Sequence, residues 1–198
     1  MEEFAEEPQL WRAIVDGDEA AFQQIYRLHF PMLYEYGMRL SANEELVKES
    51  IQQFFIKIWT NRAGLGAVKR IRPYLLVSLR GVIYNRLRDE KRRRISALED
   101  DYDFELAFSP ESVYIQKESS EQQQQALQQA MAQLTGRQKE IIFLRYYQEL
   151  EYNEIAEIMN ISVKGAYKLT ARSLESLREI LGLSVIAVIC LLKIAASR

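Results

Sequence analysis

Apolar residues recur at the three- and four-residue spacing of an α-helix along most of this chain of 198 residues. The first half holds three such repeats, over residues 22–40, 47–59 and 75–87, and Pro73 suits the first turn of the third. Gly64 and Gly66 interrupt the pattern and predict a loop over residues 61–68. Alternation of apolar and polar residues, the signal of a strand, is confined to short ambiguous runs. The sequence therefore predicts an all-α fold.

The stretch 96–121 stands between two helical parts of the chain. It lacks periodicity, is acidic and contains Ser109-Pro110, so we interpret it as a linker that is partly disordered or loosely packed. Helical signals resume with the glutamine-rich segment 122–129. We therefore predict two helical domains, at residues 8–95 and 122–181, joined by an acidic linker at 96–121 and followed by an apolar tail at 182–198.

Charge is distributed unevenly along the chain, although the formal net charge is only −2. Residues 62–94 carry 11 basic and 2 acidic side chains, a net charge of +9, between acidic segments of −6 (residues 1–61) and −7 (residues 95–121). Such a density of cations neutralises phosphates and releases counterions, the main source of nonspecific affinity for nucleic acid. Tyr74 and Tyr84 lie among the cations, and aromatic rings can stack on unstacked bases. The alternative is a solvated charged helix end whose tyrosines fill the core.

A helix-turn-helix pattern occupies residues 151–166. Ala156 is small enough for two helices to cross closely, Asn160 tolerates the left-handed turn conformation, and Ser162 suits the N-cap of the second helix. That second helix is expected to have an apolar back and a basic front, as a recognition helix in a major groove requires. The expected back comprises Val163, Ala166, Thr170, Leu174 and Leu177, and the front Lys164, Lys168 and Arg172. An ordinary amphipathic helix is the alternative.

The scarcity of reactive side chains argues against enzymatic chemistry. Cys190 is the only cysteine and His29 the only histidine, which excludes an internal disulfide framework, a thiolate zinc cluster and most metal sites or charge relays. The sequence also lacks a glycine-rich phosphate loop and a nucleophile–base pair. We therefore expect no enzyme, no cofactor and no metal site. The acidic residues 1–10 do not form a signal peptide.

In their order and spacing these segments resemble the extracytoplasmic-function (ECF) sigma factors of bacterial RNA polymerase, within the sigma-70 family, and look most like the variants common in Bacteroidetes. The resemblance covers about residues 10–181. It rests on residues 17–22, Tyr26, 47–59, 73–76 and 85–88 in the first domain, and on residues 134–146 and the helix-turn-helix in the second. It implies that residues 8–95 form sigma domain two and residues 122–181 sigma domain four, with the linker replacing the middle domain of larger sigma factors.

The resemblance implies a cytoplasmic protein that directs core RNA polymerase to specific promoters and assists promoter melting, with no bond made or broken. The helix 51–59 would bind the clamp helices of the polymerase's largest subunit, through Glu49, Gln52, Gln53, Ile56 and Lys57. The melted −10 element would be held by Lys69, Arg70, Arg72, Tyr74, Arg80, Tyr84, Asn85 and Arg88. The −35 element would be read by Ser162, Lys164, Lys168, Leu169 and Arg172. A membrane-spanning anti-sigma factor is a further expected partner.

Three positions depart from the family's pattern. Gly81 replaces an asparagine that is common on the melting helix, which argues against a direct base contact there. Asn160 stands where the turn usually has glycine, a replacement that a left-handed backbone tolerates. Leu169 replaces a polar or basic DNA contact, so methyl contacts or indirect readout would gain weight in recognising the −35 element.

The main alternative function is that of a stand-alone helix-turn-helix regulator, which binds duplex DNA without polymerase. The basic segment 62–94 and the apolar helix before it favour the sigma factor, because a repressor needs neither. The hypothesis of a membrane-tethered adaptor is supported only by the tail. The apolar run of the tail, residues 183–192, is shorter than the roughly 18–20 residues that span a bilayer. We expect the tail to pack on the linker, on the first domain or on an anti-sigma factor, and the acidic linker to shield the basic segment.

Overall fold

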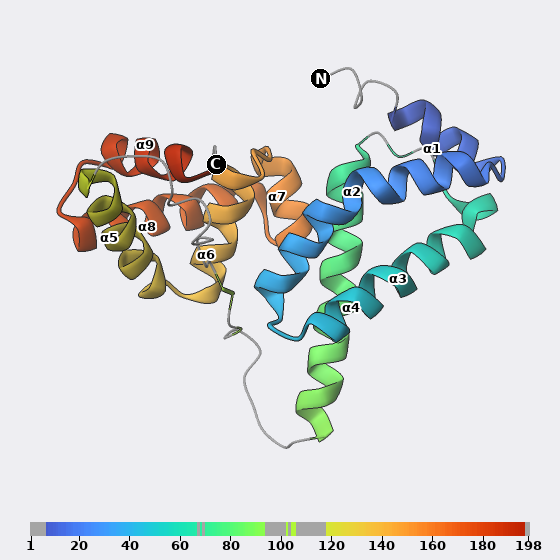
Figure 1. Cartoon of the computed structure of the whole chain (residues 1–198), viewed down its shortest axis with the longest axis horizontal. Coiled ribbons are helices and arrows are strands. Elements are labelled where there is room, and N and C mark those ends of the chain that lie inside the picture. The colour runs from blue at the N-terminus through green and yellow to red at the C-terminus, as the bar shows by residue number, and fades with distance from the viewer. Residues whose placement is uncertain are drawn as a thin grey trace. The chain divides into compact units, whose positions relative to one another are not determined.

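The computed structural model describes residues 7–66, 68, 70–93, 102, 104, 105 and 118–196, with the backbone alone for residues 90–93 and 118–124. The chain divides into two compact units, Met1–Leu98 and Glu99–Arg198, each with its own core. All regular structure in the described residues is helical, which confirms the predicted all-α fold (Figure 1).

The described part of the first unit holds four α-helices. They are α1 (Glu7–Val15), α2 (Glu19–Leu40), α3 (Glu44–Thr60) and α4 (Ile71–Arg93), with a short 3-10 turn, η1 (Arg62–Gly64), after α3. The helices α2, α3 and α4 correspond to the three predicted repeats. Two of them begin at a side-chain cap: Asp18 accepts from the amides of Ala20 and Ala21, and Asn43 accepts from the amide of Leu46. The described residues between η1 and α4 form the predicted loop.

The helix α1 is absent from the apolar pattern, because its nine residues bury only two apolar side chains, Trp11 and Ile14. The Trp11 indole donates a hydrogen bond of 3.2 Å to the carbonyl of Gly66 in the loop. On the same helix, Glu7 places Oε1 3.3 Å from Nε2 of His29 on α2, and both residues are buried. The sole histidine of the chain is therefore part of the contact between α1 and α2.

The three long helices of the first unit pack on one another through their apolar faces. Buried side chains come from α2 (Ile25, Leu33, Tyr36), α3 (Val47, Ile51, Phe54, Phe55, Ile58) and α4 (Leu75, Leu76, Leu79, Ile83). The backbone of α2 comes close to its neighbours at Gly37, where an added Cβ would lie 2.6 Å from Cγ1 of Val47 and 3.4 Å from Cδ1 of Ile83. This glycine lets the backbone of α2 lie against two neighbouring helices.

The described part of the second unit contains five α-helices and a π-helical turn. They are α5 (Glu118–Ala132), α6 (Gly136–Ile142), the turn η3 (Phe143–Tyr147), α7 (Tyr152–Met159), α8 (Val163–Leu181) and α9 (Val185–Ala196). One core cluster joins four of them, through Leu127 and Met131 of α5, Ile142 of α6, Leu174 and Leu177 of α8, and Val188 and Leu192 of α9. The apolar tail is thus a helix that completes the core of the second unit.

Three sequence-based expectations need correction here. The tail is a partly buried helix that packs on α8 and η3 of its own unit, a location that the expected partners did not include, because Val188 and Leu192 face that core. The helix α5 begins at Glu118, inside the stretch 96–121, since its polar first residues carry no apolar periodicity. Within the same stretch Phe104 is fully buried rather than loosely packed. The expected disorder of the remaining linker residues and the shielding role of the linker lie outside the described residues.

No single helix among the described residues is long and apolar enough to cross a membrane. The helices α8 and α9 pass that test only as a pair, and the two are bent by 98° relative to each other.

Gly37→Ala is expected to destabilise the first unit by about 1–3 kcal/mol, because the new methyl group collides with the buried Val47 side chain. The clash should largely vanish in a Val47→Ala background, where alanine's better helix propensity can act. Urea unfolding followed by tryptophan fluorescence measures this selectively, since Trp11 and Trp59, the 2 tryptophans of the chain, both lie in the first unit. Equal costs of Gly37→Ala in both backgrounds would contradict the assigned contact.

Candidate nucleic-acid interface

The outward side of α4 carries a compact group of basic, aromatic and amide side chains. Burial of Leu75, Leu79 and Ile83 turns the opposite side of the helix away from the core. There the guanidinium of Arg80 lies 4.3 Å from the ring centre of Tyr84, and Nη2 of Arg88 donates 3.3 Å to Oδ1 of Asn85. We call Arg80, Tyr84, Asn85 and Arg88 the α4 strip. The structure thus brings four of the predicted −10 residues onto one helix face.

Gly81 lies within the α4 strip and is exposed. No atom lies within 4 Å of the position that a Cβ would take, so packing within the protein does not demand a glycine here. The helix backbone is bare at this point, and another molecule could approach it closely.

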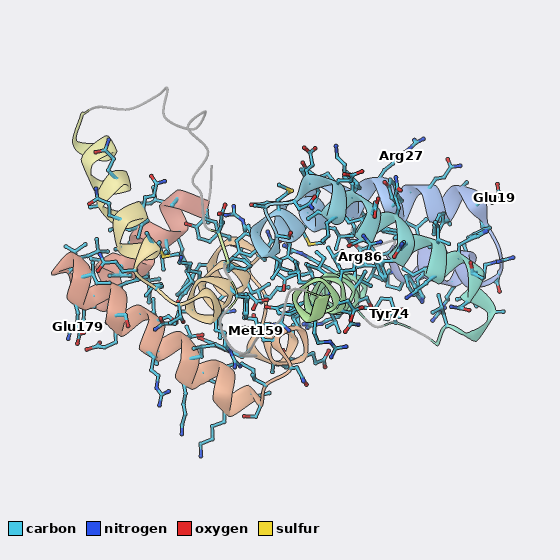
Figure 2. The ribbon with its side chains drawn as sticks, turned by 90° about the horizontal axis from the view of Figure 1, so that it is seen from below. Glu19, Arg27, Tyr74, Arg86, Met159 and Glu179 are labelled. Carbon is cyan, nitrogen blue, oxygen red and sulfur yellow. The ribbon has the colours of Figure 1, made fainter. Side chains whose placement is uncertain are left out.

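The remaining predicted −10 residues are placed differently. Tyr74 lies on α4 (Figure 2) and is half-buried. Its ring is edge-on to Trp11 at 5.3 Å and lies 6.5 Å from Phe54. Arg72 is also half-buried, and its Nε donates to Sδ of Met32 at 3.4 Å. Arg70 is exposed, whereas Lys69 lies outside the described residues. Tyr74 and Arg72 therefore contribute to packing as well as to the basic segment.

Arg86 shows that part of the basic charge is neutralised within the protein. Its side chain lies between α4 and α3 (Figure 2). It forms an ion pair of 2.9 Å with Glu49 of α3. The two side chains are 23% and 54% exposed, so the pair lies at the surface and ties the two helices together modestly. The carboxylate of Glu49, one of the predicted polymerase contacts, is thus already paired.

The outward side of α3 is polar except for one large aliphatic residue. Its five predicted contact residues are all exposed, while Val47, Ile51, Phe54, Phe55 and Ile58 face the core. We call Glu49, Gln52, Gln53, Ile56 and Lys57 the α3 face. Ile56 is 63% exposed at its centre. A single exposed isoleucine is ordinary on a protein surface, but among polar neighbours it can anchor a partner helix.

The helix-turn-helix has the predicted turn chemistry. Asn160 ends α7 in the left-handed conformation, with φ 52° and ψ 52°. The amide of Ile161 donates 2.9 Å to the carbonyl of Ala156, and Ser162 caps α8 by accepting from the amide of Gly165 at 3.0 Å. The apolar contact residues Ile155, Ala156 and Met159 of α7 are buried. The three residues singled out in the sequence, Ala156, Asn160 and Ser162, therefore form the turn as predicted.

The two sides of α8 match the prediction at all positions but one. Ala166, Thr170, Leu174 and Leu177 are buried, and Lys164, Lys168 and Arg172 are exposed. Nitrogen-tipped side chains project from α8 away from the rest of its unit (Figure 2). Val163 was assigned to the apolar side but is 44% exposed, because it is the first residue of the helix and the buried contacts begin at Ala166. Leu169 is half-buried at the edge of the basic side.

Tyr167 is a candidate contact residue that the sequence pattern does not reveal. Its side chain is 56% exposed, and its ring stacks on that of Tyr152 at 3.8 Å with an interplanar angle of 28°. The guanidinium of Arg145 lies 4.9 Å from the Tyr152 ring, donates 2.7 Å to the carbonyl of Leu150 and stands 3.6 Å from Oε1 of Glu151. The signal that could have found it is its position three residues after Lys164 and directly before Lys168. We call Lys164, Tyr167, Lys168 and Arg172 the α8 face.

These surfaces are suited to binding. The α4 strip and the α8 face offer cations beside aromatic rings, which suit phosphates and bases. Among the described residues no group of three His, Cys, Asp or Glu side chains could hold a metal ion.

Comparison with known proteins gives a consistent result for both units. The family model described as Sigma-70 region 2 matches residues 25–93, and the model described as Sigma-70, region 4 matches residues 124–177. The chain is 25% identical over 168 residues to the RNA polymerase sigma factor CarQ of Myxococcus xanthus, covering 84% of this chain and 92% of the relative. It is 24% identical over 185 residues to the ECF RNA polymerase sigma factor SigW of Bacillus subtilis, covering 85% of this chain and 92% of the relative.

Two solved structures share the fold. The sigma factor RpoE of Bartonella quintana, in complex with the anti-sigma factor NepR, has a TM-score of 0.59 at 18% identity, covering 82% of this chain and 98% of that one. CnrH, in complex with the cytosolic domain of CnrY, has a TM-score of 0.57 at 16% identity, covering 89% of this chain and 97% of that one.

Asn160→Ala should destabilise the helix-turn-helix by about 1 kcal/mol, because alanine pays the steric cost of a left-handed backbone that asparagine tolerates. Asn160→Gly should leave stability nearly unchanged, since glycine adopts positive φ freely. Hydrogen–deuterium exchange of the α7 and α8 amides in the full chain distinguishes the two variants. Equally faster exchange in both would show that the asparagine side chain, and not the backbone conformation, matters.

Proposed function

Because the chain belongs to the extracytoplasmic-function group of the sigma-70 family and directs core RNA polymerase to its promoters, we propose that three surfaces divide this work. The α3 face binds the polymerase, the α4 strip holds the melted −10 element, and the α8 face reads the −35 element. The domains are proposed as residues 8–95 and 122–181, with the second domain extended at its start to Glu118, where α5 begins, and at its end by α9, which packs in its core. The single observation that carries the proposal is that the two units matched by the two sigma-70 regions each present a cationic, aromatic surface.

Capture of unpaired bases is the task of the α4 strip. The stacking of Arg80 on Tyr84 fixes a cation on the helix surface, and the contact of Arg88 with Asn85 orders the neighbouring turn. Side chains held in advance lose less conformational entropy when they bind a strand. Lys69, Arg70 and Arg72 precede the strip and add charge at its N-terminal side, while Tyr74 supports it through its packing on Trp11. Stabilising the melted strand in this way lowers the free energy of promoter opening without bond chemistry.

Readout of the −35 element is the task of the α8 face. The basic residues Lys164, Lys168 and Arg172 are each one turn apart on α8, so all three can face the same major groove. Tyr167 lies among them and is held by its stack on Tyr152, which suits contact with a thymine methyl group or a phosphate. Leu169 contributes apolar contact from the edge of the face. The Ser162 hydroxyl caps α8 and lies beside the same groove.

Binding of the clamp helices in the largest polymerase subunit is the task of the α3 face. An exposed isoleucine flanked by glutamines and a lysine fits a helical partner, with apolar contact at the centre and hydrogen bonds around it. A stand-alone DNA-binding regulator has no use for this surface. The test is in vitro transcription: core polymerase with the purified protein should initiate at specific promoters. Tight binding of duplex promoter DNA without core polymerase would instead favour the regulator.

The protein is proposed to act in the cytoplasm, where the polymerase works, and to need no catalytic group, cofactor or metal. The RpoE neighbour is bound to an anti-sigma factor, which supports an anti-sigma partner for this chain. A membrane-spanning anti-sigma factor would couple the protein to a signal outside the cell. A Bacteroidetes affiliation rests on the sequence motifs alone.

Lys168→Ala should weaken transcription from promoters with an intact −35 element by about 5- to 100-fold, because a direct base or phosphate contact is worth roughly 1–3 kcal/mol. Transcription from a promoter with a scrambled −35 element and affinity for core polymerase should not change. Lys193→Ala, which removes an exposed lysine from α9 of the same unit, is the matched control. Loss of core affinity in Lys168→Ala would contradict the assigned role.

Ile56→Ala should weaken binding to core polymerase by roughly 5- to 30-fold, as expected when an apolar anchor worth about 1–2 kcal/mol is truncated. Ile186→Ala is the control, since Ile186 is 75% exposed on α9 and lies outside the proposed interface. Fluorescence anisotropy of labelled protein titrated with core polymerase gives both affinities. Equal affinity of Ile56→Ala and wild type would remove the α3 face from the proposal.

A further inference from the structure

A short piece of the linker is docked on the second unit, far along the chain from the helices it touches. Phe104 is fully buried, and its ring centre lies 5.7 Å from that of Phe143, which in turn stacks on Tyr147. Phe104 thus packs against η3, the turn that follows α6. We call the described linker residues Tyr102, Phe104 and Glu105 the strap.

The start of α6 is shaped to receive this strap. A Cβ at Gly136 would overlap the carbonyl oxygen of Tyr102 and would lie 3.4 Å from the amide nitrogen of Phe104. The Tyr102 hydroxyl also donates a hydrogen bond to Oε2 of Glu140, which is fully buried one turn further along α6. Only glycine leaves room for the strap backbone, because any other residue would push it off the helix. Backbone, hydroxyl and ring therefore all contact the same surface.

Docking of the strap shortens the connection between the two units. From the end of α4 at Arg93 to Tyr102 the chain has about nine residue steps, which reach at most about 30 Å at 3.3–3.6 Å per residue. If the strap were released, the connection would run from Arg93 to the start of α5 at Glu118, about 25 steps with a reach of about 85 Å. The buried Phe104 thus removes more than half of the available tether.

We propose that this clamp makes Phe104 and Gly136 positioning residues that set which spacings between the −10 and −35 elements the protein uses. The inference rests on the proposed roles of the α4 strip and the α8 face, since these surfaces belong to the two units that the tether joins. Each added base pair moves the two elements apart by about 3.4 Å. A tether of about 30 Å can span fewer added base pairs between the two elements than a tether of about 85 Å. The docked strap therefore selects against long spacers.

Two variants release the strap from opposite sides. Phe104→Ala removes the buried ring from the linker, and Gly136→Ala places a methyl group where the strap backbone lies. Leu192→Ala is the control, because it truncates a buried residue of the second unit that belongs to the cluster formed with α9. All three are made in the full chain.

The first readout is the separation of the units in the free protein, measured by electron–electron double resonance. Spin labels are placed at Asp89→Cys on α4 and Glu157→Cys on α7, both exposed, after Cys190→Ser removes the native thiol. Wild type and Leu192→Ala should give a short distance distribution, and Phe104→Ala and Gly136→Ala a broader one that extends to longer distances. Identical distributions in all four proteins would overturn the clamp.

The second readout is in vitro transcription from a promoter series whose spacer grows by one base pair at a time up to about six, or about 20 Å. Relative to its own activity at the best spacer, each of Phe104→Ala and Gly136→Ala should retain transcription at spacers about two to six base pairs longer than wild type tolerates. Longer distances with an unchanged spacer profile would overturn the assignment of spacing to the strap. Failure of the proposed function is a separate result: wild-type transcription would then not depend on the −35 element at any spacing.

Discussion

Burial of one face of each long helix is the constraint on which the functional surfaces depend. In α4 the inward positions Leu75, Leu79 and Ile83 are fully buried against α2 and α3. The helical repeat then places Arg80, Tyr84, Asn85 and Arg88 away from these positions, with Asn85 and Arg88 exposed and Arg80 and Tyr84 half-buried. The same argument applies to α3, where the buried phenylalanines turn Ile56 outward. The apolar core thus both stabilises the first unit and decides which side chains a strand or a partner helix can meet.

The second unit shows how a small number of local contacts positions the α8 face. The left-handed Asn160 and the cap at Ser162 fix the angle at which α8 leaves α7, and Ala156 lets the helices cross. Side chains outside α8 hold one residue of the α8 face in place, because Tyr167 stacks on Tyr152 and Arg145 lies over the Tyr152 ring. The tail helix α9 closes the core behind α8 through Val188 and Leu192. The apolar tail therefore supports the helix that carries the α8 face.

The net charge is an average that hides how unevenly charge is distributed along the chain. The composition of the linker likewise hides the burial of one of its residues. The total of −2 combines a +9 segment with two acidic ones, and one of its cations, Arg86, is paired with Glu49. The linker is acidic and without periodicity, yet Phe104 is as buried as any core residue. An aromatic residue in a polar segment was the available signal. Its significance depends on Gly136 and Phe143, which lie more than 30 residues further along the chain.

The sequence by itself determined the helical class, the three long helices of the first unit, the turn of the helix-turn-helix and the two sides of α8 beyond Val163, because these follow from local periodicity and capping. It did not reveal α1, the start of α5, the strap or Tyr167. Two buried side chains cannot make a pattern in α1, and polar residues give no period at the start of α5. Only the tertiary structure decided that Tyr74 packs on Trp11, that α9 joins its own unit and that Phe104 docks on η3. These outcomes depend on contacts between residues far apart in sequence, whose free energy no local pattern encodes.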